Sequence, residues 1–197
     1  VAASVLRALS GDFVPDAVNV AGGKVSEEVA LWLNLATKLG RVAGSLLGAA
    51  PQAVTVEARG ELSSESVDAL GLSALRGVFS GVIDEQVTFV NAPKIAEERG
   101  VSLQVSTQDE SVTHRSVLEV KVVSADGQSA SVIGALTGLE RVEKIVRLNG
   151  RGLDLRATGH NLFLVYGDQP GALGSVGTAL SGIALRVEGG VITVQSP

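Results

Sequence analysis

Two short segments in the last third of the chain carry residue types that could bind a small charged molecule. Residues 144–156 (KIVRLNGRGLDLR) gather several cations around an Asn-Gly pair. Residues 168–173 (DQPGAL) place an acidic side chain just before a Pro-Gly pair. Together they predict a module that senses an anionic metabolite and an amino acid, and neither segment contains a complete set of catalytic residues.

The cationic segment has the pattern of a β-hairpin, because Asn-Gly is a strong turn signal between extended residues. A two-residue loop would send Lys144 and Arg156 to opposite faces. A three-residue loop, residues 149–151, would set Lys144 directly opposite Arg156. We favour the three-residue loop because it leaves one face apolar, with Ile145, Leu153 and Leu155 together.

In that register the hairpin has the chemistry of an anion site. Two cations that face each other are destabilising unless an anion lies between them. Arginine adds a fork of donors that suits a carboxylate or phosphate. The candidate ligands are therefore Lys144, Arg151 and Arg156, and the predicted effector is a phosphate-like or carboxylate small molecule. The alternative is a solvated strand face whose charge is balanced by Glu143 and Asp154.

The second segment predicts a turn from a strand into a helix. Pro170 suits the first helical turn, where its missing donor costs nothing. The free N–H groups of that turn could hold a carboxylate, and Asp168 could pair with an amino group. An amino acid fits both halves, although the pattern by itself favours Asp168 as a simple helix cap.

The elements that would position these segments follow from hydrophobic periodicity. Serine 26 predicts the N-cap of a helix, and Asp126-Gly127 predicts a hairpin turn. The fold class is α+β, an antiparallel sheet with helices packed on one face. The expected helices span 27–47, 63–83, 92–99 and 170–180, and the expected strands 54–58, 101–106, 116–123, 129–136, 160–166, 183–187 and 191–194.

Composition excludes several classes of function. The net charge of −5 argues against a nucleic-acid-binding protein. The chain has no Cys and only two His, which leaves little for a metal site. No apolar run is long enough to span a membrane and no signal peptide is visible, so a cytoplasmic protein is expected. Because the chain starts at Val1 and has no Met, we expect a processed product or a piece of a longer protein.

The segments KIVRLNGRGLDLR and NLFLVYGDQPGALGSVGTAL resemble the C-terminal regulatory half of long-form bacterial D-3-phosphoglycerate dehydrogenases. Upstream, SEEVALWLNLATKLG, VTFVNAPKIAEERG and THRSVLEV are also similar to that family. The resemblance implies three parts: residues 1–20 as the tail of the catalytic region, residues 21–159 as the intervening allosteric substrate-binding domain, and residues 160–197 as a partial, ferredoxin-like ACT domain.

The resemblance also implies roles for single residues. Lys144 and Arg156 match the anion site of the intervening domain, with Arg186 as a weaker match that reaches toward it. Tyr166 and Asp168 match positions that contact L-serine. Trp32 matches an aromatic at the subunit contacts of a homo-oligomer, whereas the pattern of its helix makes a core residue equally acceptable. Gly152 stands where relatives can have a His in the anion site.

By this resemblance the chain carries no catalytic residue and no cofactor of its own, while the parent enzyme uses NAD to oxidise 3-phosphoglycerate in L-serine biosynthesis. The catalytic domains would then be partners in the same protein. A purely structural oligomerisation domain is the alternative function. Related domains also occur in iron–sulfur serine dehydratases, but a chain without Cys cannot hold such a cluster.

Overall fold

The computed structural model describes residues 25–83, 86–159, 161–163, 170–179, 185–188 and 191–194. It divides into two compact units, Val1–Arg156 and Ala157–Pro197. The expected catalytic tail, residues 1–20, lies outside the described residues. Among the residues described, no helix is long and apolar enough to cross a membrane.

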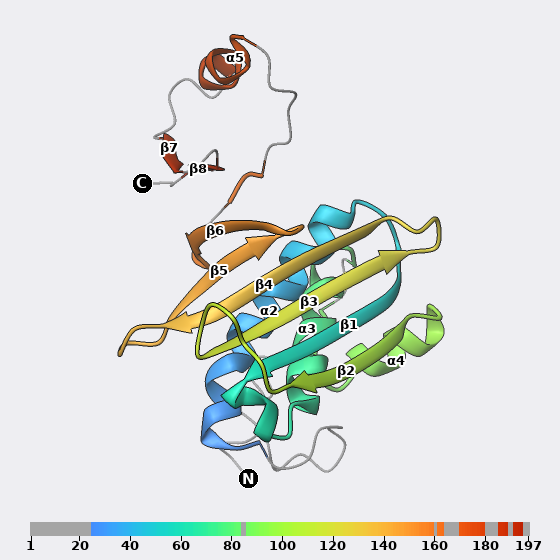
Figure 1. Ribbon diagram of the computed structural model, residues 1–197. Coiled ribbons are helices and arrows are strands. Elements are labelled where there is room, and N and C mark those ends of the chain that lie inside the picture. The colour runs from blue at the N-terminus through green and yellow to red at the C-terminus, as the bar shows by residue number, and fades with distance from the viewer. Residues whose placement is uncertain are drawn as a thin grey trace. The chain divides into compact units, whose positions relative to one another are not determined.

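The first unit is built on a six-stranded sheet with the order β2-β1-β3-β4-β5-β6 (Figure 1). Every neighbouring pair is antiparallel except β1 with β2, which is parallel. The expected α+β class is confirmed, but the sheet is mixed rather than fully antiparallel. The strands are β1 (Pro51–Gly60), β2 (Ser102–Gln108), β3 (Ser116–Ser124), β4 (Ser129–Thr137), β5 (Val142–Leu148) and β6 (Arg151–Arg156).

The parallel pair follows from the connection between its strands. Parallel neighbours require a crossover rather than a hairpin. The chain between β1 and β2 supplies the short 3-10 helix η1 (Glu61–Ser64) and the helices α3 (Asp68–Ser80) and α4 (Ala92–Glu98). Each strand read alone looks the same in either direction, which is why the sequence did not reveal this pair.

Helices α2 (Glu27–Leu47) and α3 cover one face of the sheet, as Figure 1 shows with both helices behind the strands. A Cβ built on Gly134 of β4 would lie 2.9 Å from a methyl carbon of Leu39 and 3.1 Å from one of Leu35, so this residue faces α2. Side chains between the two layers are aliphatic and fully buried; examples are Leu35, Leu39, Leu70, Val56, Leu118 and Val132. The other face of the sheet is called the open face below.

Helix α2 has the limits that its sequence predicts. The Ser26 hydroxyl accepts a hydrogen bond from the Val29 N–H at 3.2 Å and so caps the first turn. Glu27 and Glu28 place negative charge at the positive end of the helix dipole. Gly48, with φ of 64°, ends the helix in the left-handed conformation.

The expected second helix, residues 63–83, is instead broken into η1 and α3. Serine hydroxyls compete with helical hydrogen bonds at the break. The Ser64 hydroxyl donates to the Glu61 carbonyl at 2.8 Å, and the Ser63 hydroxyl donates to Asp109 at 2.8 Å. The Ser63 partner is distant in the chain, so the interruption depends on tertiary contacts.

Two ion pairs join α2 to the end of the sheet that carries β5. The Arg141 guanidinium donates to both carboxylate oxygens of Glu28 at 2.8 and 2.9 Å. Lys38 pairs with Glu143, whose other oxygen accepts from Asn34 at 2.8 Å. These contacts tie the start of β5 to the helix that lies behind it.

The Glu28 pair makes a prediction about acid stability. Its hydrogen bond with Arg141 lowers the pKa of Glu28 below the ordinary value of 4.5. A lowered folded-state pKa stabilises the fold above the unfolded pKa, and this contribution disappears as the pH falls through the folded value. We expect Glu28→Gln to reduce the unfolding free energy by about 0.5 kcal/mol at pH 7. Urea unfolding should show the stability difference between the two proteins shrinking as the pH falls below the ordinary glutamate value, and a difference that stays constant with pH would contradict this assignment.

The second unit contains helix α5 (Ala172–Ala179) and the antiparallel pair β7 (Leu185–Glu188) and β8 (Val191–Val194). These match the expected types of element over residues 170–194. The strand expected at residues 160–166 lies mostly outside the described residues, and 161–163 have no regular structure. The ACT assignment of this unit stays a prediction.

Candidate functional site

The β5–β6 hairpin turns through two residues, Asn149 and Gly150, and pairs Leu148 with Arg151. Both turn residues have positive φ, 46° and 80°. Two-residue turns of this kind match the right-handed twist of the strands they join. The three-residue loop that we expected is therefore wrong.

Lys144 nevertheless lies directly opposite Arg156, as predicted. The reason is a bulge rather than the loop length. The register changes between Ile145, which pairs with Leu155, and Arg147, which pairs with Gly152. Val146 occupies one position in β5 where β6 has two residues, Leu153 and Asp154. One extra residue reverses which side chains share a face, and it restores the pairing that a two-residue loop would otherwise forbid.

Asn149 fastens the turn to the neighbouring strand β4. Its backbone N–H donates to the Ser131 carbonyl at 2.8 Å. Its side-chain oxygen accepts from the Ser131 N–H, also at 2.8 Å. The turn thus continues the hydrogen-bonding ladder between β4 and β5, and it holds the whole hairpin in register.

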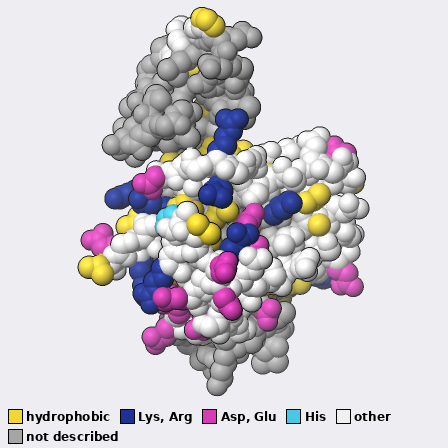
Figure 2. Space-filling model, in the orientation of Figure 1, with side chains coloured by type: hydrophobic (Ala, Val, Ile, Leu, Met, Phe, Trp, Pro, Cys, Tyr) yellow, Lys and Arg dark blue, Asp and Glu magenta, His cyan; other side chains and the backbone are white. Residues whose placement is uncertain are grey.

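The hairpin cations face the open side of the sheet. In β4, Ala135 pairs with Lys144, and Gly134, which faces α2, pairs with Ile145. Neighbouring residues of a strand point to opposite faces, so Lys144 and its partner Arg156 lie on the open face. Ile145 is only 1 % exposed and packs inward. Figure 2 views the molecule in the orientation of Figure 1, with acidic and basic side chains interspersed over the visible sheet.

Asp154 partly offsets this charge. The Lys144 ammonium lies 2.7 Å from one Asp154 oxygen and 3.0 Å from the other. The Lys144 side chain is 24 % exposed and that of Asp154 is 69 % exposed. Glu143, the other carboxylate that the alternative reading required, faces α2 and pairs with Lys38. Only one of the two expected counter-charges is therefore present on the hairpin's open face.

Arg156 is exposed, and within the described part of the chain no carboxylate lies within ion-pair distance of it. Arg151 pairs with Leu148, which in turn pairs with the buried Val132. By this pairing Arg151 lies on the side of the sheet that the helices cover. The structure brings Lys144 and Arg156 together and leaves Arg151 apart from them.

The remaining candidates are placed less completely. Arg186 belongs to strand β7, and only its backbone is described. Tyr166 and Asp168 lie outside the described residues. Trp32 lies in α2 and is 2 % exposed, so within this chain it is a core side chain. Its role as a subunit contact stays a prediction.

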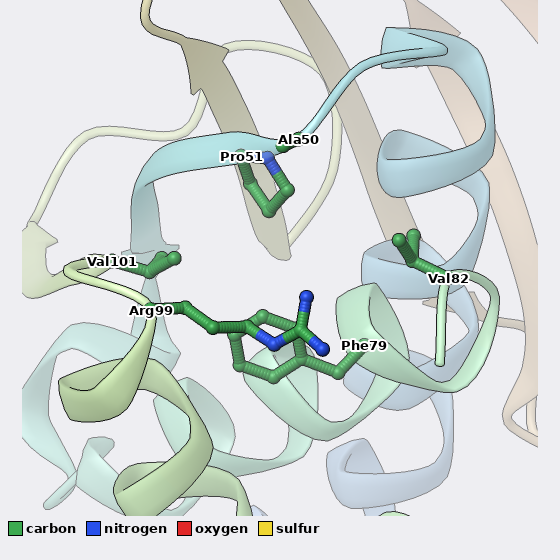
Figure 3. A pocket seen from close by; sticks show the side chains of 6 residues that line it. All are labelled: Ala50, Pro51, Phe79, Val82, Arg99 and Val101. Atoms are coloured by element: carbon green, nitrogen blue, oxygen red, sulfur yellow. The ribbon is translucent and has the colours of Figure 1, made fainter. Parts of the chain in front are cut away.

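An apolar cavity of about 230 Å³ lies elsewhere, between the ends of α3 and α4 and the start of β1 (Figure 3). The residues that line it are Ala50, Pro51, Phe79, Val82, Arg99 and Val101. None of them was a candidate, and none belongs to the hairpin. Among the residues that the structure describes, no cluster of three or more His, Asp or Glu could hold a metal ion.

Comparison with known proteins decides the family. The sequence model of the "D-3-phosphoglycerate dehydrogenase intervening domain" matches residues 28–149, which is more than half of the chain. The chain belongs to this family of intervening domains. The match includes α2, the sheet through β5, and the Asn149 of the hairpin turn, so the family assignment covers the elements that position Lys144.

Whole-protein relatives agree. D-3-phosphoglycerate dehydrogenase of Mycobacterium leprae is 54 % identical over 188 residues, covering 95 % of this chain and 36 % of the relative. The Mycobacterium tuberculosis H37Rv protein of the same name is 53 % identical over 188 residues, which again cover 95 % of this chain and 36 % of the relative. The Archaeoglobus fulgidus protein of that name is 27 % identical over 194 residues, covering 98 % of this chain and 36 % of its own length. The chain thus spans about a third of these relatives and is homologous to part of an oxidoreductase.

Proposed function

We propose that this chain is a regulatory and oligomerisation region of a D-3-phosphoglycerate dehydrogenase, and that its hairpin binds an anionic effector. The observation that carries the proposal is the direct pairing of Lys144 with Arg156 on the open face. Opposed cations cost stability unless an anion joins them. The site offers an ammonium and a guanidinium from adjacent strands, which suits a phosphate or carboxylate group.

Asp154 supports an exchange mechanism. It holds Lys144 in the absence of effector, and its own exposure leaves it free to turn away into solvent. An incoming anion would take its place between Lys144 and Arg156. The fold would then change little on binding, since the β-ladder already sets the spacing of the two cations.

The homology suggests the setting in which this site works. The longer protein would use NAD to oxidise 3-phosphoglycerate at the start of L-serine biosynthesis, in the cytoplasm and as a homo-oligomer. Its catalytic residues would come from domains outside this chain. Tyr166 and Asp168 would contact L-serine, Arg186 would belong to the anion site, and Trp32 would lie at a subunit contact.

A titration of the 197-residue chain tests the anion site. At constant ionic strength, calorimetry with inorganic phosphate and with 3-phosphoglycerate should show saturable binding. Arg156→Ala should weaken both by about tenfold or more, because it removes a charged hydrogen-bonding group. Unchanged binding by a folded Arg156→Ala protein would rule out this hairpin as the site.

Asp154→Asn provides the matched control. It removes a competing negative charge and leaves the backbone alone, so it should tighten phosphate binding. If the Lys144–Asp154 pair is merely structural, the same change should lower the melting temperature and leave binding unaffected.

The same ion pair favours the second candidate function, a structural oligomerisation domain without a ligand. In that case a stable oligomer should form whose melting temperature ignores phosphate and 3-phosphoglycerate. Bound ligand necessarily raises the melting temperature of the state that binds it, so a thermal scan with and without ligand separates the two functions.

A further inference from the structure

Arg147 is a cation of the hairpin that the sequence did not single out. It stands three residues after Lys144. In a regular strand an odd separation sends two side chains to opposite faces. By that rule Arg147 would point toward α2, away from any site built on Lys144.

The bulge at Val146 reverses this arrangement. In β4, Ile133 pairs with Arg147 and Ala135 pairs with Lys144. Ile133 and Ala135 are two residues apart in one strand and share a face. That face is the open one, because Gly134 between them faces the leucines of α2. Arg147, Lys144 and the partner of Lys144, Arg156, therefore lie on the same side of the sheet.

The strand beside Arg147 leaves space for a ligand. Its direct partner in β6 is Gly152, which has no side chain. A Cβ built on Gly152 would meet nothing within 4 Å. Arg147 is exposed and thus stands beside an open position on the edge strand, one row from the Lys144–Arg156 pair.

The acidic residue in the same cross-strand row is already engaged. Glu119 of β3 pairs with Ile133, the neighbour of Arg147. The Glu119 carboxylate accepts hydrogen bonds from Arg59 at 2.9 Å and from the Ser131 hydroxyl at 2.6 Å. Arg147 has no carboxylate within ion-pair distance in the parts of the chain that the structure describes.

We propose that Arg147 selects effectors that carry two separated anionic groups, one held by Lys144 and Arg156 and the other by Arg147. The proposal rests on the anion site proposed above. Rows on one face of a strand are about 7 Å apart, and long side chains reach across such a diagonal. The ligand class is a small phosphorylated carboxylic acid, whose two charges a single inorganic phosphate cannot match.

The test compares two ligands with the 197-residue chain at constant ionic strength. Arg147→Gln should weaken the binding of 3-phosphoglycerate by about tenfold and the binding of inorganic phosphate by less than about threefold. The reason is that only the ligand with two anionic groups reaches Arg147. Lys121→Gln is the matched control, because Lys121 is exposed on the same face and pairs with Ser131. It should change neither affinity.

A second variant checks the space rather than the charge. Gly152→Leu should fill the position opposite Arg147. It should weaken the binding of 3-phosphoglycerate more than the binding of inorganic phosphate. If Arg147→Gln weakens both ligands equally, or neither, Arg147 is not the selecting residue. If Arg156→Ala still weakens the binding of both ligands in that case, the anion site stands and only this inference fails. Failure of the wild-type chain to bind either ligand would overturn both.

Discussion

Replacing Gly77 with alanine should lower the free energy of unfolding by about 3 kcal/mol, although alanine is the better helix former. A Cβ at Gly77 of α3 would lie 2.0 Å from the Thr37 carbonyl oxygen and 2.9 Å from the Arg41 nitrogen, both in the backbone of α2. Backbone atoms cannot rotate away, so the two helices must separate. Their separation would also disturb the aliphatic layer that supports the sheet.

The matched control for Gly77 is Gly81, just beyond the end of α3. A Cβ there would meet only the Ser45 hydroxyl at 3.5 Å and an Arg41 side-chain carbon at 3.9 Å. Gly81→Ala should change stability by less than about 0.5 kcal/mol. Urea unfolding of the two variants gives the comparison. A Gly77→Ala protein as stable as the wild type would show that α2 and α3 are not in the close contact described above.

Asn149→Val should destabilise the hairpin by about 2 kcal/mol and weaken phosphate binding with it. Valine is strained at the positive φ of 46° that this turn position requires. The variant also removes the side-chain acceptor for the Ser131 N–H. Because Asn149 fastens the hairpin to β4, its disturbance should also loosen the Lys144–Arg156 pair.

Asn149→Gly separates the two causes. Glycine adopts the positive φ without strain but lacks the side-chain hydrogen bond to Ser131. The free energy of unfolding of this variant should therefore fall by only about 1 kcal/mol. Unfolding measurements give the overall loss, and hydrogen exchange at the Ser131 amide reports the local one. Equal losses in the two variants would show that backbone strain contributes nothing here.

Local signals in the sequence determined much of this protein. Ser26 and the residues after it define α2, because a cap and a helical stripe act within a few residues of each other. Alternating apolar residues predicted strands such as β5 and β6, and Asn149-Gly150 predicted the hairpin between them. The sequence also predicted that Lys144 and Arg156 face each other across the hairpin, and the strand pairing confirms this.

Tertiary structure decided what depends on partners distant in the chain. The parallel pairing of β1 with β2 and the break before α3 involve contacts across the sheet and with Asp109. The bulge at Val146 is visible only when β5 is aligned with β4 and β6. A strand has a period of two, so one extra residue moves every side chain beyond it to the other face. That single residue is why Arg147 lies on the open face while Arg151 lies on the other side. The sequence of one strand alone cannot predict which face each arginine occupies, because the bulge depends on pairing with the neighbouring strands.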